Sequence, residues 1–298
     1  MDINFLRTFV AVVDQGSMAA ASRLLNVSPS AIAQQLQALE RDLGAPLIVR
    51  VGRTVRMTEQ GGRILCHARQ LVRDANDLKS IANDAGISGE LRLGACTTPL
   101  TGMLPEILAR VSVRFPDINV HIQSGTSVQL YGEVEAGNLD AAFVLEAPFP
   151  LPKTCDWTLL HEEPLIVLAP AHLAHLNPHH LLANEPLIRY DRKLWGGRHA
   201  DEYLRQNGIV PRERFELNAL NAIAVMVDRG LGVSIVPDWS PPWPEGISVA
   251  RLPLPTHEIG RRIGVVWSRG TIRLRLVHAL LEEARASSIR PEDRMAIK

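Results

Sequence analysis

The side chains of this 298-residue chain whose types and spacing best suit chemistry lie on one predicted helix near the N-terminus. Four hydrogen-bonding residues recur three or four positions apart, which places them on one face of that helix: Ser30, Gln34, Gln37 and Arg41. Glutamine can pair with adenine through two hydrogen bonds in the major groove of DNA, and serine can contact either type of base. This face therefore predicts contacts with base edges, although an ordinary amphipathic helix also presents a polar face.

Arginine is concentrated in the same part of the chain. Between positions 41 and 73, seven arginines and no lysine are opposed only by Asp42 and Glu59. The arginines are Arg41, Arg50, Arg53, Arg56, Arg63, Arg69 and Arg73. Guanidinium groups bind phosphate and base edges, and the alternative is a solvated helix face. The whole chain carries 32 basic and 32 acidic residues, which argues against a protein that coats nucleic acid through its overall charge.

A helix-turn-helix is the arrangement expected to position the polar face. Residues 4–13 predict a first helix, and residues 18–25 predict a short, alanine-rich second helix followed by a tight turn. Ser28 suits the N-cap of the third helix, Pro29 its first position and Gly44 its end. The apolar side chains expected to face the core from this third helix are Ile32, Leu36, Leu39 and Leu43.

Residues 47–58 predict two short strands joined by a turn at Gly52. A basic hairpin beside a helix-turn-helix forms a wing, whose arginines contact phosphates or enter the minor groove. The candidate DNA contacts of the whole region are Ser28, Ser30, Gln34, Gln35, Gln37, Arg41, Arg50, Arg53 and Arg56.

The next predicted helix, residues 59–85, carries apolar side chains at alternating spacings of four and three. A heptad seam of this kind pairs two helices in a coiled coil. It predicts a homodimer that reads two half-sites of an operator, and the alternative is a helix packed against its own domain. The seam consists of Ile64, Ala68, Leu71, Ala75, Leu78, Ala82 and Ala85, of which the first six are the candidate dimer contacts.

Several spaced positions of the N-terminal region match one pattern together. They are residues 20–25, residues 28–36, Leu39-Glu40, Leu43-Gly44, Pro46-Leu47, Arg50, Arg53 and residues 58–61. This pattern resembles the LysR-type transcriptional regulators. That family usually has Gln at the position of Pro29, Ser or Thr at the position of Ala33, and Phe at the position of Ile48. Because Pro29 and Ala33 have no side-chain donor, we expect an altered operator sequence that is read mainly by Ser30, Gln34 and Gln37.

Composition changes near residue 88, where helical patterns give way to β-rich runs that alternate with helices. This alternation predicts an α/β fold with a largely parallel sheet. The predicted strands are residues 91–95, 119–124, 141–145, 165–169, 233–236 and 263–267.

The resemblance implies an N-terminal winged helix-turn-helix with a long linker helix, followed by a two-lobed α/β domain like that of periplasmic binding proteins. The implied divisions are 1–58 for the DNA-binding domain, 59–88 for the linker or dimerisation helix and hinge, and 89–298 for the effector-binding domain. The chain is expected to cross between lobes near Glu162 and Gly264. Lobe I would then comprise about 89–162 and 265–298, and lobe II about 163–264.

Polar residues stand at three predicted strand–helix junctions of the second half. Ligands in open α/β sheets bind beyond the carboxyl ends of strands, where helix N-termini offer free N–H groups. Each residue alone is alternatively an N-cap, but together they predict a cleft for a small polar or anionic effector. The candidate effector contacts are Cys96, Thr97, Thr98, Gly125, Thr126, Ser127, Tyr190, Trp195 and Asn218, with Trp239 as a further aromatic wall.

Other chemistry has weaker support. Four histidines lie within nine residues, but Asn177-Pro178 breaks their register, so we expect no metal site there; they are His172, His175, His179 and His180. Cys66, Cys96 and Cys155 are too few and too widely spaced for a disulfide scaffold, and Cys96 is interpreted as a small buried thiol rather than a redox sensor. The sequence shows no nucleophile–base arrangement, Walker loop or dinucleotide fingerprint, so we expect neither catalysis nor a cofactor.

The sequence therefore predicts a cytoplasmic, sequence-specific regulator that binds double-stranded promoter DNA as a homodimer or homotetramer. A small effector in the C-terminal cleft modulates that binding, and no segment is apolar enough to enter a membrane. The resemblance also allows RNA polymerase as a partner. The alternative is an intracellular α/β ligand-binding protein or enzyme with an accessory helical domain.

Overall fold

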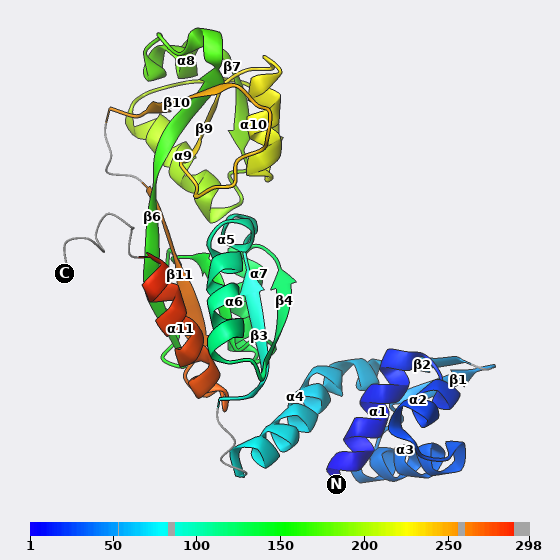
Figure 1. Cartoon of the computed structure of the whole chain (residues 1–298). Coiled ribbons are helices and arrows are strands. Elements are labelled where there is room, and N and C mark those ends of the chain that lie inside the picture. Colours follow the sequence, from blue (N-terminus) through cyan, green and yellow to red (C-terminus); the bar gives the residue numbers. More distant parts are fainter. Residues whose placement is uncertain (53, 83–86, 256–259, 289–298) are drawn as a thin grey trace, which may run out of the picture. The chain divides into compact units, whose positions relative to one another are not determined.

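The computed structural model describes residues 1–52, 54–82, 87–255 and 260–288. The chain separates into an N-terminal unit, Met1–Gly89, and a C-terminal unit, Glu90–Lys298 (Figure 1). None of the helices within the described ranges is both long and apolar enough to span a lipid bilayer.

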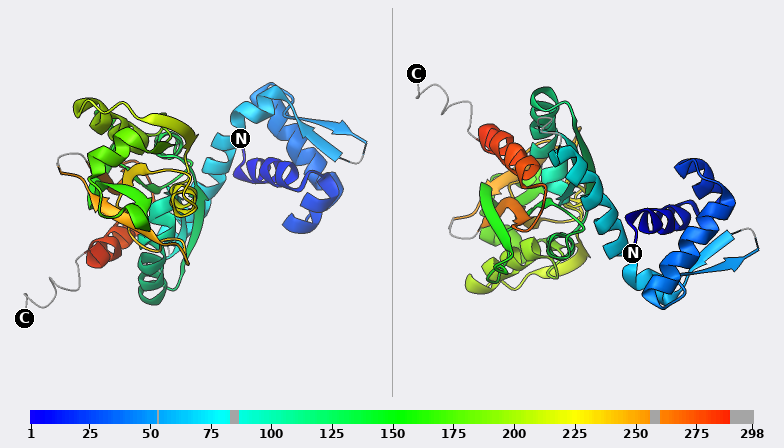
Figure 2. Two further views of the ribbon diagram at one scale, coloured as in Figure 1. Left: turned by 90° about the horizontal axis from the view of Figure 1, so that it is seen from above. Right: turned by 90° about the horizontal axis from the view of Figure 1, so that it is seen from below.

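The N-terminal unit consists of helices and one hairpin that projects beyond them in every view (Figures 1 and 2). Its elements are α1 (Ile3–Gln15), α2 (Met18–Leu25), α3 (Pro29–Leu43), β1 (Ile48–Val51), β2 (Thr54–Met57) and α4 (Glu59–Ala82). The ends of α3 form as predicted. Ser28 Oγ accepts a hydrogen bond from the Ala31 backbone N–H at 3.2 Å, Pro29 occupies the first turn, and Gly44 adopts a φ of 69°.

The core of this unit lies between α1, α3 and the first half of α4. Phe9 and Val12 of α1 are fully buried, as are Ile32, Leu36 and Leu39 of α3. The prediction that Leu43 completes this apolar stripe is wrong, because its side chain remains 41% exposed. Leu43 is the last residue of α3, where the helix ends at Gly44.

Gly61, in the first turn of α4, lies close to the backbone of Leu47, the residue before β1. A Cβ at this position would lie 2.1 Å from the Leu47 carbonyl oxygen, which is backbone and cannot rotate away. We therefore expect Gly61→Ala to lower the free energy of unfolding of the N-terminal unit by about 1–3 kcal/mol through overpacking. Thermal denaturation followed by circular dichroism tests this. Gly62→Ala is the matched control, because a Cβ there meets nothing within 4 Å, and an equal loss in both variants would contradict the explanation.

The C-terminal unit has two lobes, each with a sheet flanked by helices (Figure 1). Lobe I contains β3 (Gly89–Ala95), α5 (Thr97–Thr101), α6 (Met103–Arg114), β4 (Ile118–Ser124), α7 (Ser127–Glu135), β5 (Ala141–Leu145) and α11 (Leu274–Ser288). Lobe II contains the 3₁₀ turn η1 (Ala171–Leu173), α8 (Pro178–Asn184), β7 (Pro186–Tyr190), α9 (Trp195–Gln206), β8 (Arg212–Leu217), α10 (Leu220–Asp228), β9 (Ser234–Pro237) and β10 (Val249–Pro253). Two long strands, β6 (Cys155–Pro170) and β11 (Gly260–Ser268), connect the lobes.

The main sheet has the strand order β10-β6-β11-β5-β3-β4, with β9 also paired to β6. The prediction of a largely parallel sheet is wrong for this unit. β3 pairs with β5 in parallel, as does β7 with β8, but β11 is antiparallel to both β5 and β6, and β6 is antiparallel to β9 and β10. The antiparallel pairs arise because the chain enters lobe II along β6 and returns along β11.

β6 changes its partners between the lobes. Its residues up to Pro164 pair with β11, and its residues from Leu165 onward pair with β9 and β10. The β6–β11 ladder contains one irregularity, a register shift between Ile263 and Gly264. Gly264 is required there, because a Cβ would lie 2.1 Å from the Thr158 carbonyl oxygen.

Candidate DNA-binding surface and ligand cleft

The predicted polar face of α3 is open to solvent. Ser30, Gln34, Gln37 and Arg41 are all exposed, whereas Ile32, Leu36 and Leu39 on the other face are buried. At the start of the helix the hydroxyls of Ser28 and Ser30 lie 2.9 Å apart. Near its end the Arg41 Nε–H donates to the Gln37 carbonyl oxygen at 3.3 Å. The face therefore presents four hydrogen-bonding side chains that the fold of this unit does not need for its core.

Gln35 differs from the other candidate DNA contacts. Its side chain is partly buried, and its Oε1 accepts a hydrogen bond of 2.5 Å from the Thr8 hydroxyl of α1. Its carbonyl oxygen is therefore already engaged within the unit, and any base contact would fall to its amide N–H groups.

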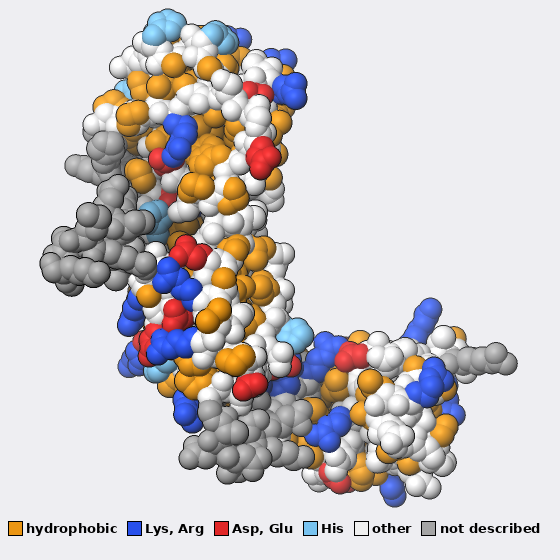
Figure 3. Space-filling model, in the orientation of Figure 1, with side chains coloured by type: hydrophobic (Ala, Val, Ile, Leu, Met, Phe, Trp, Pro, Cys, Tyr) orange, Lys and Arg blue, Asp and Glu red, His pale blue; other side chains and the backbone are white. Residues whose placement is uncertain are grey.

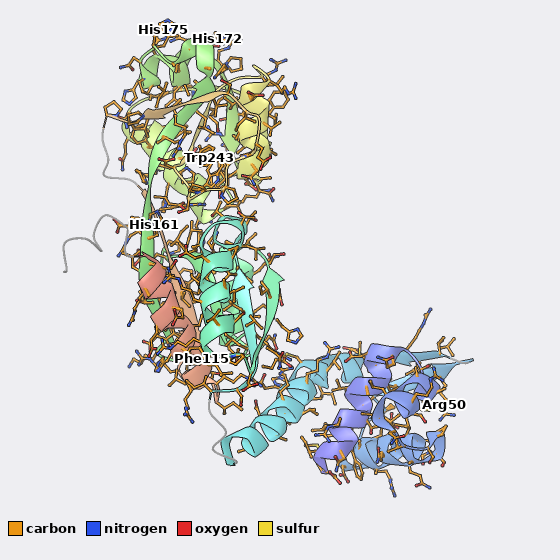
Figure 4. All side chains as sticks on the ribbon, viewed as in Figure 1. Arg50, Phe115, His161, His172, His175 and Trp243 are labelled. Atoms are coloured by element: carbon orange, nitrogen blue, oxygen red, sulfur yellow. The ribbon has the colours of Figure 1, made fainter. Side chains whose placement is uncertain are left out.

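The hairpin β1–β2 carries the predicted wing arginines. Arg50 and Arg56 are exposed, and the Arg50 Nη2 lies 2.7 Å from the Met18 sulfur of α2 (Figure 4). Arg53 lies outside the described residues. Two other arginines of the basic run are paired: Arg63 with Glu59 at 2.7 Å, and Arg69 with Asp14.

The residues of the predicted dimer seam of α4 differ in their exposure to solvent. Ala68 is 2% exposed within the core of its own unit, and Ile64 packs against the same core. Leu71 and Leu78, one heptad apart on the same face of the helix, are instead 45% and 64% exposed. Ala75 is partly buried. Ala82 lies in the last turn of α4, and Ala85 lies outside the described residues. The alternative of packing within the domain thus holds for Ile64 and Ala68.

All nine candidate effector residues line one cavity of about 320 Å³ between the two lobes. Lobe I contributes the residues after β3 and those at the start of α7, and lobe II contributes those after β7 and before α10. The predicted residues on this cavity are Cys96, Thr97, Thr98, Gly125, Thr126, Ser127, Tyr190, Trp195 and Asn218. The antiparallel return of the chain thus still brings the strand–helix junctions of both lobes to one place.

The N-cap alternative holds for only one of the three junctions. Thr126 Oγ1 accepts from the Gln129 N–H at 3.4 Å, and Gln129 Oε1 accepts from the Thr126 N–H at 3.1 Å, which forms a capping box. Cys96 precedes α5 and Ala219, beside Asn218, precedes α10, and neither end has a side-chain cap among the described residues.

Cys96 and Ser127 form a buried polar pair at the cavity wall. The Ser127 hydroxyl accepts from the Leu145 N–H at 3.1 Å and lies 3.2 Å from the Cys96 sulfur. Burial raises the pKa of the Cys96 thiol, against the weaker opposing effect of its hydrogen bond with Ser127. A protonated, buried thiol is a poor nucleophile.

Aromatic side chains occupy two different environments near the cleft. Trp195 lines the cavity and packs at ring-centroid distances of 5.3 Å from Tyr131 and 5.7 Å from Phe149. Tyr190 also lines it, and burial raises the pKa of its hydroxyl. Trp239 is not a wall of this cavity: it is 1% exposed in the core of lobe II, stacked 3.7 Å from Trp243.

Sequence reasoning missed the charged centre of the cleft, Arg261. This side chain lines the cavity and is 2% exposed. Its Nε–H donates to Glu163 Oε2, and its Nη2 donates to the Thr98 hydroxyl at 2.6 Å. Glu163 Oε1 in turn accepts from the Ser240 N–H at 3.3 Å. A signal existed, because Glu162-Glu163 and Arg261-Arg262 are complementary pairs that flank the two predicted crossings.

The four clustered histidines do not converge. Figure 4 places His172 and His175 at the end of lobe II, beside α8. His179 Nε2 is hydrogen-bonded to the Tyr203 hydroxyl at 2.7 Å. Within the described ranges, no three His, Cys, Asp or Glu side chains form a group that could hold a metal ion.

Comparisons with known proteins cover both units. Residues 3–62 match the family described as bacterial regulatory helix-turn-helix protein, lysR family, and residues 84–288 match the LysR substrate binding domain. The transcriptional regulator CzcR of Bacillus cereus is 29% identical over 238 residues, which span 80% of each chain. The transcriptional activator IlvY of Salmonella typhimurium is 27% identical over 252 residues, which span 80% of this chain and 83% of IlvY.

Solved structures agree along nearly the whole chain. Full-length CbnR in complex with its target DNA has a TM-score of 0.67 and 25% identity, covering 96% of this chain and all of CbnR. Full-length OxyR of Pseudomonas aeruginosa shares the fold, with a TM-score of 0.65 and 22% identity over 96% of this chain and 98% of OxyR. With a family match to each unit, one of them spanning more than half of the chain, this protein belongs to the LysR family of DNA-binding transcriptional regulators.

Proposed function

We propose that α3 and the β1–β2 hairpin contact promoter DNA, with the polar face of α3 in the major groove. The observation that carries this assignment is the exposure of Ser30, Gln34, Gln37 and Arg41 opposite a fully buried apolar face. Side chains in these positions can reach base edges, while Arg50 and Arg56 on the hairpin provide contacts with phosphates, as does Arg53, which precedes β2 in the sequence.

We propose that two copies of the chain pair through α4. Leu71 and Leu78 are separated by one heptad and stay exposed, so a second α4 can bury both. Ala75 and Ala82 complete that part of the seam, whereas Ile64 and Ala68 stabilise the N-terminal unit itself. Two copies related by a two-fold axis then read the two half-sites of an operator.

We further propose that a small effector in the cleft modulates DNA binding without being chemically transformed, and that the protein works in the cytoplasm. The raised pKa of the Cys96 thiol supports a binding role rather than a nucleophilic one. Ligand binding at a cleft shared by two lobes changes DNA affinity only through a difference in affinity between two arrangements of the protein.

An electrophoretic mobility shift with the full-length protein tests the DNA-binding assignment. We expect a fragment from the region upstream of its own coding sequence to remain bound in the presence of excess unrelated competitor DNA. If no fragment of that region survives the competitor, the proposed operator contacts are wrong, and an α/β ligand-binding protein or enzyme with an accessory helical domain becomes the better description.

A further inference from the structure

We propose that the cleft selects an effector with one carboxylate, no ammonium group and an apolar body, and that Glu163 sets the limit of one negative charge. The proposal rests on the proposed function only in taking this cleft as the effector site. The evidence for it is the distribution of charge among the residues that line the cavity and those that contact them.

The first observation is that one charged side chain faces the cavity. Among the described residues that line it, Arg261 is the only one with a charge, and no aspartate or glutamate is present. A guanidinium has five N–H donors, and Glu163, Thr98 and the Tyr190 hydroxyl are hydrogen-bonded to the guanidinium of Arg261. The remaining donors can bind a ligand carboxylate. An ammonium group would find neutral acceptors but no carboxylate at this wall, so its buried charge would remain uncompensated.

The second observation is that Glu163 neutralises Arg261 from behind. Glu163 is 1% exposed and does not line the cavity, so it balances the charge without offering itself to a ligand. Burial and the charge of Arg261 lower the pKa of His199, which disfavours a second cation there. One ligand carboxylate can share the Arg261 donors, but a second carboxylate would be desolvated with no cation to meet it.

The third observation concerns the helices that start at the cavity. The first residues of α7, α9 and α10 all line it. Neither α9 nor α10 has a side-chain cap among the described residues, so their first N–H groups are open to an acceptor. Helix N-termini carry partial positive charge, which adds to the preference for an anion over a cation.

The rest of the wall combines apolar side chains, which set the body of the ligand, with neutral hydroxyl and amide groups. Trp195, Leu145, Val128 and Leu220 line the cavity together with the neutral amides of Asn218 and Asn221. Its volume of about 320 Å³ is at the small end of ligand sites. A compact branched or aromatic acid therefore fits, with a hydroxyl or carbonyl group as an allowed neutral substituent.

Matched ligand quartets test the selection with the full-length protein. One quartet is 4-methylpentanoate, its amide, leucine and isobutylmalonate, which differ only in the charges near one carbon. A second is phenylacetate, its amide, phenylglycine and phenylmalonate. By isothermal titration calorimetry we expect the monocarboxylate of each quartet to bind at least roughly tenfold more tightly than its three counterparts. The proposal is overturned if an amide, amino acid or malonate binds as tightly as its monocarboxylate, or if neither monocarboxylate binds at millimolar concentration.

Variants of the buried pair separate the role of Glu163 from general packing. We expect Glu163→Gln to improve the binding of the malonates relative to the monocarboxylates by roughly tenfold or more, because Arg261 then carries an uncompensated charge. Glu162→Gln is the matched control, because Glu162 is the next residue on β6 but is 63% exposed and pairs with the exposed Arg262. Unchanged discrimination in Glu163→Gln, or an equal change in the control, contradicts the proposal.

If Glu163→Gln does not fold, the double variant Glu163→Gln/Arg261→Gln removes both buried charges. In this variant the helix N-termini remain, so we expect the preference for each acid over its amide to fall by roughly tenfold or more rather than to vanish. An undiminished preference for the acid would contradict the role of Arg261. These measurements contain no DNA. If the acids bind as expected but do not change the affinity for DNA, the proposed function is refuted and the ligand selectivity stands. If an effector changes the affinity for DNA but the acids are not preferred, the ligand selectivity is refuted and the proposed function stands.

Discussion

Arg261→Met is expected to lower the free energy of unfolding of the C-terminal unit by about 3–5 kcal/mol, because it leaves a buried carboxylate without its cation. Glu163 is 1% exposed, and after the substitution its side chain would keep only the hydrogen bond from the Ser240 N–H. The variant would also leave the Thr98 hydroxyl without its donor. All five tryptophans lie beyond residue 90, so tryptophan fluorescence during urea denaturation reports on this unit alone.

Two further variants decide whether the loss comes from the broken charge pair. Arg262→Met removes the neighbouring arginine, which is 43% exposed and pairs with Glu146 and Glu162, and such a surface pair contributes less than about 1 kcal/mol. Glu163→Gln/Arg261→Met removes both buried charges and should recover most of the stability lost in Arg261→Met. Equal losses in Arg261→Met and Arg262→Met, or no recovery in the double variant, would contradict this account.

Gln34→Ala is expected to weaken specific DNA binding by about 1–3 kcal/mol for each half-site, because a two-hydrogen-bond contact with a base is lost. In a dimer this binding free energy is lost at both half-sites, so the total effect is large. Discrimination between bases should relax at one base pair of each half-site. Fluorescence anisotropy with operator fragments that carry single base changes measures both effects. Gln206→Ala is the control, since Gln206 is an exposed glutamine of α9 in the other unit.

Arg53→Ala should behave differently from Gln34→Ala. A phosphate contact carries no sequence information, so its loss weakens binding to operator and random DNA to a similar extent and flattens the dependence of affinity on salt. If both substitutions reduce specific and random binding equally, α3 does not read bases through Gln34.

Local signals predicted much of the cleft. Cys96, Thr126 and Asn218 each follow or precede a recognisable strand or helix, and parallel pairing within each lobe brings such junctions to the same edge. Arg261 escaped prediction because its burial depends on Glu163, which lies 98 positions earlier in the chain and meets it only across the β6–β11 ladder. The parallel-sheet prediction failed for the same reason, since periodicity within a strand does not reveal which strand pairs with it or in which direction.

The heptad pattern of α4 predicted which residues share one face of the helix, but not which of them are buried. Ala68 and Leu71 belong to one heptad series, yet the first is buried within its own unit and the second is exposed. A spacing of four and three identifies one face of α4 but not what covers it, because α1 packs against the first half of that face. Figure 3 shows hydrophobic side chains at the surface among charged ones. Which apolar side chains stay exposed in this way depends on the faces that the tertiary fold covers.

The two-stranded connection between the lobes has a mechanical consequence. Sliding β6 along β11 by one residue would turn every side chain to the opposite face, so the two strands can only twist and bend together. The ladder is already interrupted between Ile263 and Gly264, and irregularities of this kind increase the local twist of a strand. We therefore expect any change in the angle between the lobes to concentrate at this register shift. The twist of these two paired strands would then change together with the angle between the lobes.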